Sequence, residues 1–307
     1  MRSAASVSEP GRARAEATRS YGALASVCLF WGTTYITIRM ALESFPPLKL
    51  VAIRFTLAGA VLLAAAALKG ARLPKGRELW SGALTGVLLL GGSNTCLVFS
   101  ETWIPSGLAA LFITISPFWM VGTEALMPGG DRLRRSAILG MLVGLAGTAL
   151  LVERSSAGEG FGSGPMLARG FVILQLGNAC WALGSIYYRR QPARAHPIVN
   201  GAIQMLSAGL ALGLAALIVP ERAIAPTARG VGGLVYLILF GSLVGYSSYI
   251  YALTHLRVAL VSIYPYVNTV VAVFLGWWFY REPLGFREIA AMVIIFAGVA
   301  LVKRAGK

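Results

Sequence analysis

The sequence has few of the charged residues that keep a protein surface in water. Only 13% of its 307 residues are charged, whereas about a quarter are charged in a typical soluble domain. By contrast, 57% are hydrophobic, and the mean hydropathy is +0.71. Most of the chain therefore cannot face water, and we expect it to face lipid or other helices in a membrane.

Residues that carry catalytic or metal chemistry are also scarce. The chain has one aspartate, Asp131, and two histidines, His196 and His255, which lie at the ends of apolar runs. Its three cysteines lie inside apolar runs with no visible pairing or metal-site spacing. The motifs G-x-x-x-x-G-K-[ST], H-E-x-x-H and G-x-S-x-G are absent. We therefore expect no enzyme, no metal and no cofactor, with an intramembrane enzyme as an alternative class.

The apolar runs are long enough for ten membrane-spanning helices, because a bilayer core needs about 20 apolar residues per helix. The predicted fold is thus an all-α membrane protein. We place its spans at residues 20–42, 48–68, 79–99, 104–126, 135–152, 170–188, 197–219, 231–252, 258–280 and 285–302.

The basic residues predict how these spans are oriented. The formal net charge of +15 would suggest nucleic-acid binding, but Lys and Arg lie in short segments between apolar runs. With the N-terminus in the cytoplasm, 18 of the 27 Lys and Arg residues fall in inside segments and 5 in outside loops. We therefore expect both termini in the cytoplasm and no nucleic-acid partner.

The two halves of the sequence resemble each other. Trp31 in the first span has a counterpart in Trp181 in the sixth, and Pro47 has one in Pro197. Because each half has five spans, an odd number, the second copy is inserted upside down relative to the first. Such inverted repeats are a signature of secondary transporters, whose site lies near the midplane. The predicted segments are a tail at 1–19, repeats at 20–152 and 170–302, a linker at 153–169 and a tail at 303–307.

A family resemblance rests on the duplicated five-span unit and on two stretches of sequence. These are Trp31-Gly32 and the late segment that runs from Ala259 through Arg281-Glu282-Pro283-Leu284 to Leu301. Over residues 20–302 the sequence resembles the EamA domain of the drug/metabolite transporter superfamily. It is most similar to the bacterial aromatic amino-acid exporters, which share a Trp in the first and sixth helices. The resemblance implies a secondary transporter of the bacterial inner (plasma) membrane, working in export.

The spans hold polar and aromatic residues that suit a binding cavity. Trp31, Thr34 and Tyr35 share one helical face by their spacing, as do Asn178 and Trp181. Ligand pockets are commonly apolar and aromatic with a few placed polar groups, and aromatic faces also attract an ammonium group. The predicted substrate-binding residues are Trp31, Thr34, Tyr35, Asn94, Ser116, Trp119, Asn178, Trp181, Tyr246, Tyr266 and Arg54.

Arg54 is the basic residue that lies deepest in a span. It has three possible roles: binding a substrate carboxylate, pairing with Glu43, or reaching the outer lipid headgroups. Arg39, nearer the outer face, is the other cation available to a phosphate-bearing substrate. No carboxylate lies at a midplane position, although Glu124 near the inner end of the fourth span keeps proton coupling possible.

Two prolines inside spans are candidate hinges. Pro117 lies in the fourth span and Pro265 in the ninth. Each removes a backbone hydrogen bond and permits a kink. Because these spans are repeat partners, they are predicted to bend alternately, although static kinks are equally common in membrane helices. Thr269 stands where the family usually has a proline, and Pro265 lies four residues earlier.

The predicted function is transport of small metabolites by alternating access, with amino acids that have aromatic or apolar side chains as substrates. The alternatives are a sugar-phosphate or nucleotide-sugar carrier and an exporter of drugs or lipophilic cations. The partners are the small-molecule substrate and the lipid bilayer. Three Gly-x-x-x-Gly pairs, at residues 82–86, 140–144 and 209–213, are expected to pack helices within one chain, so we expect a monomer.

Overall fold

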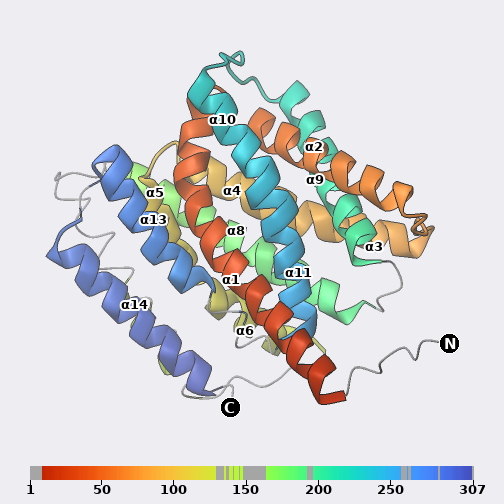
Figure 1. Cartoon of the computed structure of the whole chain (residues 1–307). Helices are drawn as coiled ribbons and strands as arrows, with labels where there is room; N and C mark the ends of the chain where they lie inside the picture. The colour runs from red at the N-terminus through yellow and green to blue at the C-terminus, as the bar shows by residue number, and fades with distance from the viewer. Residues whose placement is uncertain are drawn as a thin grey trace.

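The computed structural model describes residues 9–128, 164–191, 196–256, 264–282 and 284–305, together with Val261 and isolated residues between 135 and 147. Within these residues the chain is helical and has no β-strand, and the helices form a bundle (Figure 1). Seven helical segments in this part of the chain are long and apolar enough to cross a membrane: Glu16–Leu42, Pro47–Leu68, Arg77–Ser100, Ser106–Leu126, Gly164–Arg190, Pro197–Ile218 and Ala228–His255.

Several spans are built from more than one helical element. In chain order the elements are α1 (Glu9–Leu42), α2 (Pro47–Leu68), α3 (Arg77–Gly86), η1 (Val87–Gly92), α4 (Ser93–Ser100), α5 (Ser106–Ile113), α6 (Ser116–Leu126), α8 (Gly164–Arg190), α9 (Pro197–Ile218), α10 (Ala228–Tyr236), η2 (Leu237–Val244), α11 (Gly245–His255), α13 (Tyr264–Tyr280) and α14 (Phe286–Ala305).

The seven spans agree with seven of the predicted ones to within a few residues at most ends, although α1 begins inside the predicted tail 1–19 and α8 inside the predicted linker. The ninth and tenth predicted spans correspond to α13, with 17 residues, and α14, whose apolar stretch is Ile289–Gly298. Most of the predicted span 135–152 and of the linker 153–169, and the start of span 258–280, lie outside the described residues. The ten-helix arrangement therefore stays a prediction.

Three predicted spans are not continuous α-helices. The fourth is broken into α5 and α6 by a turn at Thr114 and Ile115, and Pro117 lies in the first turn of α6, where its missing N–H is tolerated. The third and eighth contain the π-helical segments η1 and η2. These two lie at similar depths, beginning 10 residues after Arg77 and 9 residues after Ala228. A π-helical turn is rare and is frequently found at functional sites.

The helices of the first half, up to residue 152, pack on those of the second half in a mirrored pattern. Repeat partners α2 and α9 pack together, as do α5 and α13. Several other contacts also have counterparts: α1 on α11 corresponds to α8 on α4, and α1 on α13 to α8 on α5 and α6. Likewise, η1 on α9 corresponds to η2 on α2. This pattern is what an inverted repeat would produce.

Small residues let helices approach closely inside the chain. A side chain at Gly86 would meet the Gln204 Cα at 2.5 Å, and one at Gly209 would meet the Thr56 backbone nitrogen at 2.5 Å. These contacts join α3 to α9 and α9 to α2. Gly86 and Gly209, which belong to two of the predicted Gly-x-x-x-Gly pairs, therefore pack helices within the chain.

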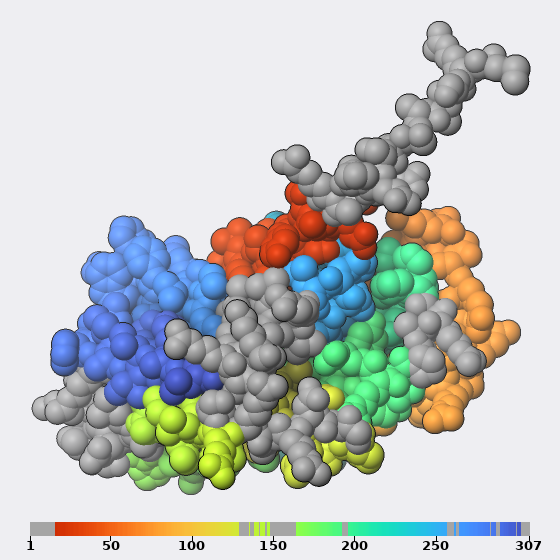
Figure 2. Space-filling model, turned by 90° about the horizontal axis from the view of Figure 1, so that it is seen from below, coloured from red at the N-terminus to blue at the C-terminus, as the bar shows by residue number. Residues whose placement is uncertain are grey.

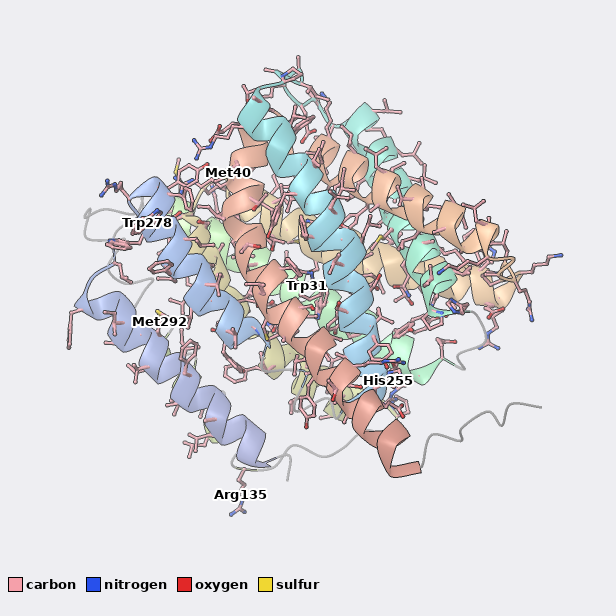
Figure 3. All side chains as sticks on the ribbon, viewed as in Figure 1. Trp31, Met40, Arg135, His255, Trp278 and Met292 are labelled. Carbon is pink, nitrogen blue, oxygen red and sulfur yellow. The ribbon has the colours of Figure 1, made fainter. Side chains whose placement is uncertain are left out.

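The bundle has two ends, which orient the description of the site. Met40 and Trp278 lie toward one end and His255 and Arg135 toward the other, while Trp31 lies between them (Figure 3). The first turns of α1 and the last of α14 point toward the same end (Figure 1). Seen from that end, α13 and α14 occupy one side and α2 and α3 the opposite side, with α1 and α11 between them (Figure 2).

Candidate functional site: a polar and aromatic cavity

A cavity lies between elements of the two halves. The first half lines it with α1, α2, η1, α4, α5 and α6, and the second half with α8, η2, α11 and α13. Nine of the predicted binding residues line it: Trp31, Thr34, Tyr35, Arg54, Asn94, Ser116, Asn178, Trp181 and Tyr246.

Among the described residues that line the cavity, Arg54 alone carries a charge. It is only 4% exposed. Its Nε donates to Ser242 Oγ at 2.8 Å, and its Nη1 lies 3.5 Å from Asn94 Oδ1. A guanidinium has five N–H donors, so these two hydrogen bonds leave donors for an anion. Burying a cation without a partner of opposite charge is costly, and no described carboxylate forms an ion pair with Arg54.

The structure excludes the two other roles considered for Arg54. Glu43 accepts a hydrogen bond from Tyr280 Oη at 2.9 Å and lies 3.4 Å from Arg229 Nη1, so it is engaged elsewhere. The low exposure of Arg54 keeps its charge away from lipid headgroups. Arg39 pairs with Glu282 and does not line the cavity. Of these two arginines, Arg54 is the one that lines the cavity.

Four rings form an aromatic cluster, which we define as Trp31, Trp181, Tyr249 and Tyr264. Their centroids lie 5.1 to 5.8 Å apart in five pairs, three of which involve Trp31. Edge-to-face aromatic pairs at such distances contribute about 0.5–1.5 kcal/mol each. The cluster draws its rings from α1, α8, α11 and α13, so it joins the two halves.

A second, smaller cavity borders this cluster. Trp181, Tyr264 and Ser116 line both cavities, and Tyr249 lines the smaller one. The smaller cavity is also lined by both predicted hinge prolines and by apolar side chains: Pro117, Pro265, Met120, Leu253 and Val261. The cluster therefore separates the polar cavity from an apolar one.

Both π-helical segments reach the larger cavity. Leu90 of η1 and Gly241 of η2 line it. Trp31 Nε1 donates to the Gly241 carbonyl at 2.9 Å, which fixes the indole across the two halves. A side chain at Gly241 would lie 2.9 Å from Arg54 Nη2, so the absence of one makes room for the guanidinium.

Two predicted binding residues lie outside the cavity. Trp119 is 37% exposed, and its Nε1 donates to Gln175 Oε1 at 2.9 Å on α8. Tyr266 packs against Phe296 of α14 at 5.6 Å between centroids. Residues that are two positions apart in a helix lie on nearly opposite faces. Because Tyr264 lines the cavity, Tyr266 on the same helix faces away from it.

Some lining residues were not among the predicted binding residues, and Tyr264 and Asn268 are the main examples. They are four residues apart, and this spacing places both on the same face of a helix. A helical-face argument applied to the ninth span would have found them. The carboxylate of Glu124 lies 2.9 Å from Arg190 Nη2 and does not line either cavity.

A bundle of apolar helices around a polar cavity that both halves line is the architecture of a membrane transporter. The chain belongs to the EamA-like transporter family, whose family model matches it twice, at residues 19–153 and 168–304. The chain is a transporter and not an enzyme.

Individual relatives agree with this assignment. The chain is 36% identical to the uncharacterized inner membrane transporter YedA of Escherichia coli (strain K12), over 92% of this chain and 90% of that protein. It is 30% identical to the aromatic amino acid exporter YddG of Ancylobacter novellus, over 53% and 55% of the two chains. It is 28% identical to a probable terminal-alkyne amino-acid exporter of Streptantibioticus cattleyicolor, over 94% of each. A crystal structure 24% identical shares the fold, with a TM-score of 0.68 and coverage of 92% and 96%.

Proposed function

We propose that this protein exports amino acids with aromatic or apolar side chains across a bacterial inner membrane by alternating access between two inverted five-helix repeats. The observation that carries the proposal is Arg54: a buried cation with no described carboxylate partner, facing a cavity rich in aromatic rings. The guanidinium would hold the substrate carboxylate, with Asn94 and Ser242 positioning it.

The remainder of such a substrate also finds partners in the cavity. Trp31, Trp181 and Tyr264 offer aromatic faces to its ammonium group and to its side chain. The names of two relatives, an aromatic amino acid exporter and a probable terminal-alkyne amino-acid exporter, support this substrate class and its direction of movement.

The cavity disfavours the two other substrate classes. A sugar phosphate carries about two negative charges and needs several cations, whereas Arg54 is the charged residue among those described as lining the cavity. A lipophilic cation would be repelled by Arg54, since no lining carboxylate among the described residues offsets it. An amino acid, with one carboxylate and one ammonium group, matches a single arginine among aromatic rings.

The mirrored packing of the halves and the separation of the two cavities support alternating access. In this arrangement the aromatic cluster closes the polar cavity on the side of the prolines. Bending near Pro117 and Pro265 would separate the rings of the aromatic cluster and open the polar cavity on the side of these prolines. These prolines would then act as hinges, because they border the smaller cavity from both halves.

The test is transport by purified protein in liposomes. The panel contains labelled tryptophan, leucine, a sugar phosphate, and an aromatic amine that lacks the carboxylate. We expect saturable transport of the amino acids only. Arg54→Gln should raise the KM for them by about 10- to 100-fold, because a hydrogen bond to a charged group contributes about 1.5–3 kcal/mol. Arg54→Lys should retain more activity than Arg54→Gln.

The matched control is Arg229→Gln, which removes an arginine near Glu43, away from the cavity. It should leave the KM unchanged. Transport of the sugar phosphate alone would contradict the amino-acid proposal. Equal KM values for wild type and Arg54→Gln would remove Arg54 from the binding site.

A further inference from the structure

Glu101 is a buried carboxylate that none of the contacts described above uses. It lies in the connection between the spans Arg77–Ser100 and Ser106–Leu126, at the same end of the bundle as Arg39. The residue is 7% exposed, and neither of its carboxylate oxygens has a hydrogen-bond partner among the described residues. An ionised carboxylate in such a place is costly, and the usual outcome is that it binds a proton instead.

The nearest charged groups do not satisfy Glu101. Arg39 forms an ion pair with Glu282. Glu282 also accepts hydrogen bonds from the Ser106 backbone nitrogen at 3.0 Å, from Ser106 Oγ at 2.7 Å and from the Gly107 nitrogen at 3.0 Å. The carboxylates of Glu101 and Glu282 thus lie near one guanidinium, that of Arg39. Its single positive charge is paired with Glu282, so the charge of Glu101 is not neutralised.

Helix α4, which ends one residue before Glu101, packs on α2 and α8, and Glu101 also interacts with groups on α1. On α1, Tyr35 and Arg39 interact with it electrostatically. On α2, Arg54 donates to Ser242 and Asn94, and on α8, Arg169 is exposed. Tyr35 is the important neighbour, because it interacts with Glu101 and also lines the larger cavity.

We propose that Glu101 is a proton-binding site at the Arg39 end of the transport path, and that its proton is released when this end opens to water. No covalent step is involved: the proton passes from the carboxyl oxygen to water on opening and returns on closing. The role in transport rests on the proposed function, whereas the binding of the proton does not. A proton gradient would then bias which side of the transporter is open.

The direction of the pH effect follows from the surroundings of the carboxyl group. Burial, then the Glu282 carboxylate, raise the pKa of Glu101 well above its ordinary value, and Arg39 lowers it. A carboxyl group whose pKa is raised in the closed state stabilises the closed state relative to the open state at low pH. That stability is lost as the pH rises from the ordinary glutamate value through the raised one. Alkaline pH should therefore favour opening at this end.

The first experiment needs no substrate. Infrared difference spectra of the full-length protein in lipid vesicles are recorded between mildly acidic and alkaline pH. We expect a protonated carboxyl band that persists above the ordinary glutamate pKa in wild type and is lost in Glu101→Gln. Glu101→Asp should shift the band and keep it. The control Glu124→Gln, which removes a carboxylate paired with Arg190, should leave the band unchanged.

A band unchanged in Glu101→Gln, or no such band in wild type, would overturn the proposal. Glu101→Asp keeps the test valid if Glu101→Gln fails to fold, because a shifted band assigns the carboxyl group equally well.

The second experiment measures transport against the pH on the Arg39 side. The wild-type rate should change by up to about tenfold per pH unit, the limit for one proton. Glu101→Gln should transport at a rate that no longer depends on this pH. A Glu101→Gln rate that keeps the wild-type pH profile would contradict the coupling. Absence of amino-acid transport in wild type would count against the proposed function alone, since the infrared band still decides whether Glu101 holds a proton.

Discussion

At the scale of single residues, Trp31 has two roles at once. Its ring contacts three others in the aromatic cluster, and its Nε1 donates to the Gly241 carbonyl in the second half. Trp181 shares the ring contacts with Trp31 and Tyr249. These side chains therefore couple the wall of the polar cavity to the contact between the halves.

Replacing these rings should impair transport. Trp31→Ala removes three ring contacts of about 0.5–1.5 kcal/mol each, so we expect transport to fall by at least about tenfold. Trp31→Phe keeps a ring and loses the hydrogen bond to Gly241, so its loss should be smaller. Trp181→Ala should resemble Trp31→Ala. Initial rates in liposomes, normalised to inserted protein, measure this, and normal rates in both alanine variants would contradict a role for the cluster.

Much of the cavity could be predicted from residue types, because polar and aromatic side chains are rare in a bilayer and need a reason to be there. This logic found Arg54, Asn94 and Asn178. It chose Tyr266 and not Tyr264, because residue type alone does not say which helix face points inward. Glu101 was not identified, because it follows the apolar run and only the structure shows that it is buried.

At the scale of helices, α3 and α9 approach each other closely at Gly86. Gly86 lies against the backbone of Gln204, whose side chain in turn accepts a hydrogen bond from Tyr246 in the cavity wall. A larger residue at position 86 would push α9 away from α3 and shift that wall. Packing between these helices therefore reaches the site.

Gly86→Ala should destabilise the protein by about 1–3 kcal/mol, the usual range for overpacking against a rigid neighbour. The matched control is Gly232→Ala on α10, where an added Cβ meets nothing within 4 Å. Thermal unfolding in detergent at a fixed heating rate compares the two. A similar apparent Tm for Gly86→Ala and wild type would show that α9 moves aside easily.

Helix positions could be predicted well and helix interruptions could not. The length of an apolar run fixes where a span begins and ends, since both ends must reach water. The break at Thr114 and Ile115 and the π-helical segments lie inside apolar runs, and hydropathy is the same whichever hydrogen-bond pattern the backbone adopts. Pro117 indicated a distortion in the fourth span, but it starts a new helix there and does not kink a continuous one.

At the scale of the whole molecule, the mirrored contacts place equivalent helices of the two halves around one cavity. The sequence predicted this duplication from landmarks such as Trp31 and Trp181, which meet at 5.5 Å between ring centroids. Packing does not indicate which side of the membrane each end faces, so the orientation is a prediction from the distribution of positive charge.

Both termini are predicted to lie in the cytoplasm. An epitope tag at either end should resist a protease added to intact spheroplasts and be digested after permeabilisation. The same tag inserted in the segment 153–169, predicted to lie outside, is the control and should be digested at once. Digestion of a terminal tag in intact spheroplasts would reverse the predicted orientation.

The paired π-helical segments also bear on ancestry. A π-helical turn closes its hydrogen bond one residue later than an α-helical turn, so one inserted residue can convert the one into the other. The family model matches the chain twice, and η1 and η2 lie at similar depths in corresponding spans. One insertion before gene duplication explains both, whereas two later insertions would have to coincide. A single repeat that already held this wider turn is the simpler origin of both segments.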